Sequence, residues 1–106
     1  MADLSFDVRS HGADGIVIAV AGEVDMATAP QLADCLLDHS DTDVTVDLSQ
    51  VGFLDSAGLN VLVHAYKRVR DEGHRLRTTG EQDHVLAVIK ASGLDDYFHA
   101  NDAPAE

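Results

Sequence analysis

The sequence has few of the residues that cross-link or anchor a small protein: one cysteine, two prolines and no tryptophan. Because Cys35 has no second cysteine to pair with, an internal disulfide is excluded, which suits a reducing compartment. The longest apolar run, residues 16–21, is too short to cross a bilayer. The opening residues MADLSFDVRS lack the basic start and apolar segment of a secretory signal. We therefore expect a cytoplasmic protein that does not enter a membrane.

Basic residues are also scarce. Seven Lys and Arg stand against 19 Asp and Glu, so the formal net charge is −12. Nucleic acids and anionic membranes require clustered cations, and direct binding to either is therefore disfavoured. Several of the few cations lie between Lys67 and Arg77. We interpret them as solvated charges near the end of a helix, where the helix dipole favours them.

Motifs of catalysis and of metal binding are missing from the sequence. It contains no G-x-S-x-G elbow, no P-loop and no G-x-G-x-x-G. The histidines lack the short spacing of a metal site on one element; they are His11, His39, His64, His74, His84 and His99. We expect no catalytic residue, no metal and no cofactor. Cys35 lies at helical spacing beside Leu32 and Leu36, which predicts a buried, inert thiol, with a redox role as the alternative.

Hydrophobic periodicity predicts an α/β fold. Residues 4–9 alternate as a strand does, and after turn residues 11–15 the apolar run 16–21 predicts a buried second strand that Gly22 closes. Helical spacing follows over 27–39, a third strand over 44–49, and a long apolar helical stripe from residue 59 to a stop at Gly73. A weak strand over 74–78 precedes a helix over 82–93 that Gly93 ends. Residues 94–98 pack back, and 99–106 form a flexible tail.

This order of elements predicts one domain over residues 1–106, ordered from about 3 to 98. Strand–helix–strand alternation implies parallel pairing with right-handed crossovers, and the leading hairpin adds an antiparallel edge. We therefore predict a mixed β-sheet with helices packed against it.

The residues FLDSAG, 53–58, join the third strand to the long helix. We expect Ser56 at the N-cap, where its hydroxyl would stabilise the helix by about 1 kcal/mol. An exposed hydroxyl at a helix start also suits a phosphoryl acceptor, because a phosphate there would meet backbone donors. The two roles are compatible. Gly58 lets another surface approach closely.

The segment VDLSQVGFLDSAGLNVLVHAYKRV, with the earlier GEVD and the later VIKASGLDDYF, resembles the STAS-domain anti-sigma-factor antagonists from about Val17 to Phe98. The resemblance implies a STAS-like fold and phosphorylation of Ser56 by a partner that is both anti-sigma factor and serine kinase. A phosphatase would restore the unmodified form. That form would capture the anti-sigma factor and free a sigma factor for transcription, so the chain would be a substrate of enzymes rather than a catalyst.

The same resemblance implies a partner-binding surface around Ser56, on a protein that is a monomer when free. We expect this surface to comprise Glu23, Asp25, Asp55, Ala57, Gly58 and Asn60. Asp25 has a structural alternative, capping the helix near Ala27 in competition with Thr28, and Asp55 has the alternative of a turn residue. Many members of the family carry Ser or Thr where Ala57 stands, and Gly where Asn60 stands.

The resemblance also leaves a second function open. STAS domains serve as scaffolds in stress-signalling assemblies and as regulatory subunits of membrane transporters.

Overall fold

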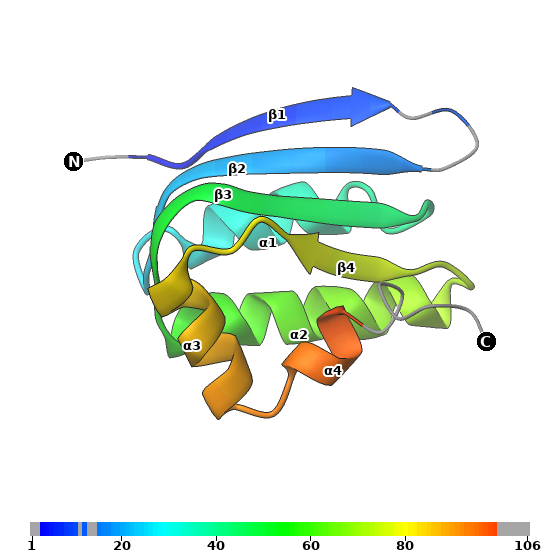
Figure 1. Cartoon of the computed structure of the whole chain (residues 1–106). Helices are drawn as coiled ribbons and strands as arrows, with labels where there is room; N and C mark the ends of the chain where they lie inside the picture. Colours follow the sequence, from blue (N-terminus) through cyan, green and yellow to red (C-terminus); the bar gives the residue numbers. More distant parts are fainter. Residues whose placement is uncertain (1–2, 11, 13–14, 100–106) are drawn as a thin grey trace.

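The computed structural model describes residues 3–10, 12 and 15–99. Four strands form one sheet in the order β1 (Ser5–Ser10), β2 (Ile16–Val24), β3 (Val44–Leu54) and β4 (Leu76–Thr79). β1 pairs antiparallel with β2, and the pairs β2–β3 and β3–β4 are parallel (Figure 1). The predicted mixed sheet with an antiparallel edge is confirmed. Parts of the predicted turn and tail, residues 11, 13–14 and 100–106, lie outside the described residues.

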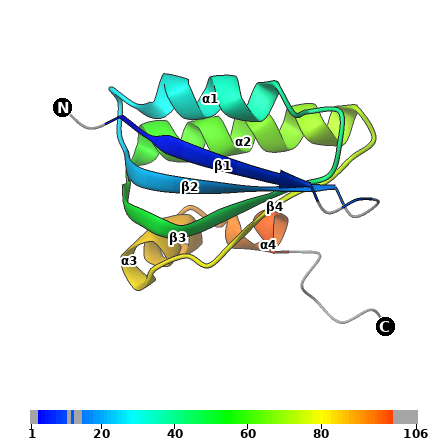
Figure 2. The same ribbon diagram turned by 90° about the horizontal axis from the view of Figure 1, so that it is seen from above.

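The four helices are α1 (Ala29–Leu37), α2 (Ser56–Asp71), α3 (Asp83–Ala91) and α4 (Asp95–Phe98). Figure 2 shows α1 and α2 side by side along one face of the sheet. α3 contacts β3 and α4 contacts β4, at the end of the sheet away from β1. The segment expected to pack back is α4, whose Phe98 is buried against the core.

The core lies between the sheet and the helices. Buried residues of β2 and β3, which alternate in β3 as far as Leu48, face the helices, and the apolar stripe on α2 meets them. Burial of this apolar area supplies most of the stabilisation of a domain of this size. The fully buried members of these three elements include Ile18, Val20, Val24, Val46, Leu48, Val51, Leu62 and Val69.

Two predicted strand boundaries are wrong. β2 continues past Gly22 to Val24, and β3 runs to Leu54 instead of ending near residue 49. The pairing of β2 with β3 continues past two β-bulges, at which the register between the strands shifts. Gly22, at one of these shifts, has φ of 125°, a conformation that residues with a Cβ rarely adopt. Near the other register shift, the side chain of Gln82 contacts β3: its Nε2 donates to the backbone carbonyl of Ser49, at 3.1 Å.

The predicted glycine stops of the second and third helices are confirmed, whereas the first helix spans Ala29–Leu37 instead of 27–39. Gly73 and Gly93 take positive φ angles of 86° and 78° directly after α2 and α3. The N–H that follows each glycine reaches back to a carbonyl of the last helical turn. Arg68 and Arg70 lie in the last turn of α2, where the dipole favours them, and Arg68 Nε pairs with Glu72 Oε2 at 3.0 Å.

Candidate functional site

The topology brings the carboxyl ends of β2 and β3 together. Glu23 faces Phe53 and Val24 faces Leu54 in the parallel register. The N–H of Asp55 donates to the carbonyl of Val24, at 3.2 Å. The segments 23–28 and 53–60 therefore lie side by side where the carboxyl ends of β2 and β3 meet and where α1 and α2 begin (Figure 1). We call these two segments the carboxyl-edge site.

Asp55, and not Ser56, is the N-cap of α2. The backbone N–H groups of Ala57 and Gly58 donate to Oδ1 of Asp55, at 2.9 and 3.2 Å. The expectation that the Ser56 hydroxyl caps the helix is therefore wrong. The physical reason is the length of β3: the strand runs to Leu54, so the extended residue before the helix is Asp55.

Ser56 is the first helical residue of α2 and is exposed. Within the described part of the chain, its hydroxyl has no hydrogen-bond partner. Asn60 and His64 are also exposed and follow at helical spacing, so Ser56 begins the solvent-facing side of α2. The hydroxyl is thus presented to solvent with no structural role of its own.

Asp25 closes the turn that leads into α1. Its Oδ1 accepts from the N–H groups of Ala27 and Thr28, at 2.9 and 3.0 Å. Thr28 is the N-cap residue by position, but its hydroxyl makes no cap bond and donates to the carbonyl of Glu23, at 2.7 Å. Of the two residues expected to compete for the cap, Thr28 has the cap position, and Asp25 stabilises the turn before it. A role for Asp25 in partner binding stays a prediction.

Gly58 is buried beneath the first turn of α2. A Cβ at this position would lie 2.5 Å from Val24 Cγ1 and 2.6 Å from Leu54 Cδ1. The surface that approaches Gly58 closely is therefore the chain's own pair of strand ends. Its role in partner binding, like that of the half-buried Ala57, stays a prediction.

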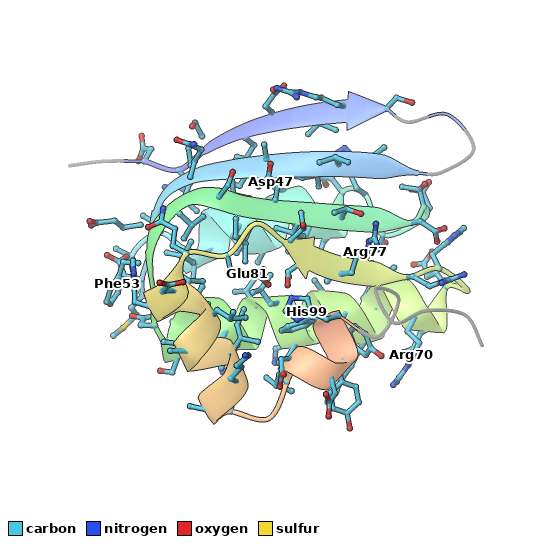
Figure 3. The ribbon with its side chains drawn as sticks, in the orientation of Figure 1. Asp47, Phe53, Arg70, Arg77, Glu81 and His99 are labelled. Atoms are coloured by element: carbon cyan, nitrogen blue, oxygen red, sulfur yellow. The ribbon has the colours of Figure 1, made fainter. Side chains whose placement is uncertain are left out.

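The carboxyl-edge site carries acidic groups and no cation. Glu23 is exposed, and Asp25 and Asp55 are half-buried. The sequence has no Lys or Arg between Arg9 and Lys67, a stretch that includes the whole site. Figure 3 shows Arg70 and Arg77 at the opposite end of the molecule from Phe53. A negative charge added at Ser56 therefore meets no neutralising side chain of the site.

Two exposed apolar residues of the site were not identified from the sequence. Met26 is 78% exposed in the turn between β2 and α1, and Phe53 is 44% exposed near the end of β3. Phe53 lies in an apolar pair with the buried Leu54, which in a strand places one side chain out and the other in. For Met26, no local sequence pattern indicates the exposure, which depends on how the turn after Asp25 closes.

A second polar cluster lies away from the site, where β4 meets the end of α4 (Figure 3). The hydroxyl of Thr78 donates to Glu81 Oε2 at 2.5 Å, and His99 Nε2 contacts the same oxygen at 2.6 Å. Burial raises the pKa of the Glu81 carboxyl, but the hydrogen bonds of Thr78, the backbone and His99, with the His99 charge, outweigh it and lower the pKa. The cluster ties His99, where the predicted tail begins, to β4.

The remaining candidates are a metal site, the Cys35 thiol and a membrane span. Among residues 3–10, 12 and 15–99, no group of three or more His, Cys, Asp or Glu is arranged to hold a metal ion. Cys35 is half-buried rather than buried as expected; burial and the nearby Asp38 raise the pKa of its thiol. Over the same described ranges, no helix combines the length and apolar composition needed to span a bilayer.

Known proteins with similar sequences and similar folds identify the family of this chain. The family model described as "Mlab, STAS domain" matches residues 7–99. The anti-sigma-B factor antagonist of Listeria monocytogenes is 30% identical over 107 residues, covering 98% of this chain and 94% of the relative. A solved anti-sigma factor antagonist from Mycobacterium paratuberculosis is also 30% identical, with a TM-score of 0.72 over 90% of this chain and 82% of that one. The unphosphorylated anti-sigma factor antagonist SpoIIAA, 18% identical, shares the fold with a TM-score of 0.74 over 88% of this chain and 84% of its own.

The sheet order, the helix arrangement and the matched residues are those of a STAS domain. Within that class, the chain belongs to the family of STAS-domain anti-sigma-factor antagonists.

Proposed function

We propose that the chain binds an anti-sigma factor with serine-kinase activity while Ser56 is unmodified, and that phosphorylation of Ser56 ends the complex. Binding would release a sigma factor for transcription in a bacterial stress response. A phosphatase would return the chain to its binding form. The chain works in the cytoplasm as a monomer and is the substrate, not the catalyst, of both reactions.

The observation that carries this proposal is the state of the Ser56 hydroxyl. It is exposed at the start of α2, and within the described residues no hydrogen bond occupies it. A kinase needs an accessible acceptor, and phosphorylation of Ser56 would break no side-chain hydrogen bond among the described residues. Asn60, one turn further along α2, leaves the approach from solvent open.

The expectation that backbone donors would receive the phosphate needs correction. Asp55 Oδ1 already accepts from the N–H groups of Ala57 and Gly58. A phosphoryl group on Ser56 would therefore project outward, beside the Asp55 carboxylate, instead of replacing it at the helix start. The added charge is presented to the docking partner.

The size of this charge is sufficient for a switch. A phosphoserine brings roughly −1.5 to −2 charges at neutral pH. Two unit charges about 4 Å apart interact by about 1 kcal/mol in water and about 4 kcal/mol near a protein surface. Each 1.4 kcal/mol changes an affinity by about tenfold. Phosphorylation can thus weaken a complex by an order of magnitude or more while the domain stays folded.

The test uses the purified chain, ATP and each kinase-type anti-sigma factor encoded in the same genome. Mass spectrometry should locate one phosphoryl group, on Ser56, and the Ser56→Ala variant should remain unmodified. The Ser56→Asp variant should lose binding while its circular-dichroism spectrum and melting temperature stay those of the unmodified chain. Modification at another residue, or no binding to any of these anti-sigma factors, would contradict the proposal.

A further inference from the structure

We propose that Met26 and Phe53 are the two apolar anchors by which the carboxyl-edge site holds its partner. The partner surface that fits them is an apolar pocket bordered by Lys or Arg. This inference rests on the proposed function, since the occupant is the same anti-sigma factor, and it adds which side chains supply the affinity.

Exposure is the first observation. Met26 and Phe53 are two of the five large apolar side chains that the described residues leave exposed; the other three are Val8, Leu37 and Tyr97. Those three lie on β1, at the end of α1 and on α4. Methionine and aromatic residues are enriched in the centres of protein interfaces, where a few buried side chains contribute most of the binding energy.

Rigid backbone under both residues is the second observation. Met26 lies in a turn closed by reciprocal bonds: the N–H of Asp25 donates to Thr28 Oγ1 at 3.0 Å, and the N–H of Thr28 donates to Asp25 Oδ1 at 3.0 Å. Phe53 lies in a strand, paired with Glu23, and the next residue is buried. Anchors on fixed backbone lose little conformational freedom on docking, so more of their contact energy appears as affinity.

Charge identifies the chemistry of the partner. Glu23 is exposed and is the register partner of Phe53, and Asp25 precedes Met26. The site contains no Lys or Arg. A partner with basic groups around its apolar pocket therefore complements the site, and this complementarity speeds association.

Two anchor variants and two matched controls test the inference. Met26→Ser and Phe53→Ser remove exposed apolar groups inside the site. The controls Leu37→Ser and Tyr97→Ser remove exposed apolar groups outside it, 47% and 54% exposed, which is close to Phe53 and less than Met26. Calorimetric titration with the anti-sigma factor that phosphorylates Ser56 should show each anchor variant binding at least about tenfold more weakly. The controls should stay within about twofold of the unchanged chain. Equal affinities for all four variants would overturn the anchor assignment.

A second measurement is made on the unchanged chain, with a variant needed only to assign a signal. The chain has only two methionines, Met1 and Met26, so labelling with ¹³C-methyl methionine gives few signals, which a Met26→Leu variant assigns. A soluble paramagnetic agent should broaden the Met26 methyl signal in the free chain and spare it in the complex. A signal that stays equally accessible in the complex would refute the burial of this anchor.

The salt dependence of association tests the Lys or Arg border of the partner's pocket. Association should slow as the salt concentration is raised, and a rate that rises with salt would contradict the border.

The outcomes separate this inference from the proposed function. If no kinase-type anti-sigma factor binds or modifies the unchanged chain, the proposed function fails and the anchors lose their partner. If the partner binds, and Ser56→Asp abolishes binding while Met26→Ser and Phe53→Ser do not weaken it, the switch stands and only the anchor assignment fails.

Discussion

Replacing Asp55 by alanine should destabilise the domain, whereas replacing its neighbour Ser56 should not. Asp55→Ala removes the carboxylate that accepts two N–H groups of the first turn of α2, those of Ala57 and Gly58. Loss of such a cap costs about 1 kcal/mol, within a range of about 0.5–2 kcal/mol. For a domain of about 100 residues, 1 kcal/mol corresponds to about 4–8 °C in melting temperature.

Ser56→Ala is the matched control. The serine is exposed and has no hydrogen-bond partner among the described residues, so its loss should change the free energy of unfolding by less than about 0.5 kcal/mol. Alanine is also the better helix former, which acts in the stabilising direction. Asp55→Asn should keep most of the stability, because asparagine caps about as well as aspartate.

Urea unfolding followed by far-ultraviolet circular dichroism measures all three variants. The expected order of stability places Ser56→Ala and Asp55→Asn close to the unchanged chain and Asp55→Ala clearly below it. If Ser56→Ala were as destabilised as Asp55→Ala, the serine would be the cap. Its hydroxyl would then be engaged in the fold, and the reasoning that leaves it available for phosphorylation would be refuted.

Three further predictions concern other parts of the fold. Gly58→Ala should lower the urea midpoint, because overpacking against Val24 costs about 1–3 kcal/mol and exceeds a helix-propensity gain of about 1 kcal/mol. Gly52→Ala is the control and should not lower the midpoint, because nothing lies within 4 Å of the added Cβ. Equal midpoints for the two variants would contradict the close packing at Gly58. The free energy of unfolding should fall as pH drops from the ordinary carboxyl pKa of about 4.5 through the lower pKa of folded Glu81, because the unfolded chain binds the proton first. Glu81→Gln should flatten that slope, and an unchanged slope would refute the role of the cluster. Cys35 should react with a thiol reagent more slowly than free cysteine, since burial raises its pKa; a fast reaction would favour the redox alternative.

Most of the fold follows from hydrophobic periodicity in the sequence. Apolar and polar residues alternate over residues 4–9, and α2 has a helical period, and these patterns locate the two elements. The second half of β3 does not follow from periodicity. Its bulges break the alternation after Leu48, and the exposed Ser49 and Gln50 resemble a loop. Because the prediction ended the strand too early, it placed the N-cap of α2 at Ser56, one residue after the observed N-cap Asp55.

That single position decided the assignment of the cap. Aspartate and serine are about equally good N-cap residues, so the pair Asp55–Ser56 gives no preference without the end of the strand. The family resemblance implied a surface formed by Glu23, Asp25, Asp55 and Ser56, and the parallel register brings the segments that carry these residues side by side. The exposure of Met26 depends on how its turn closes, which no local sequence pattern reports.

The central claim is that a negative charge on Ser56 decides whether the partner binds. Calorimetric titration of the anti-sigma factor with the unmodified chain, and with the same chain fully phosphorylated on Ser56, measures this directly. The account predicts that phosphorylation weakens binding at least about tenfold, equivalent to about 1.4 kcal/mol or more, with an unchanged circular-dichroism spectrum. Equal affinity of the two forms would contradict it.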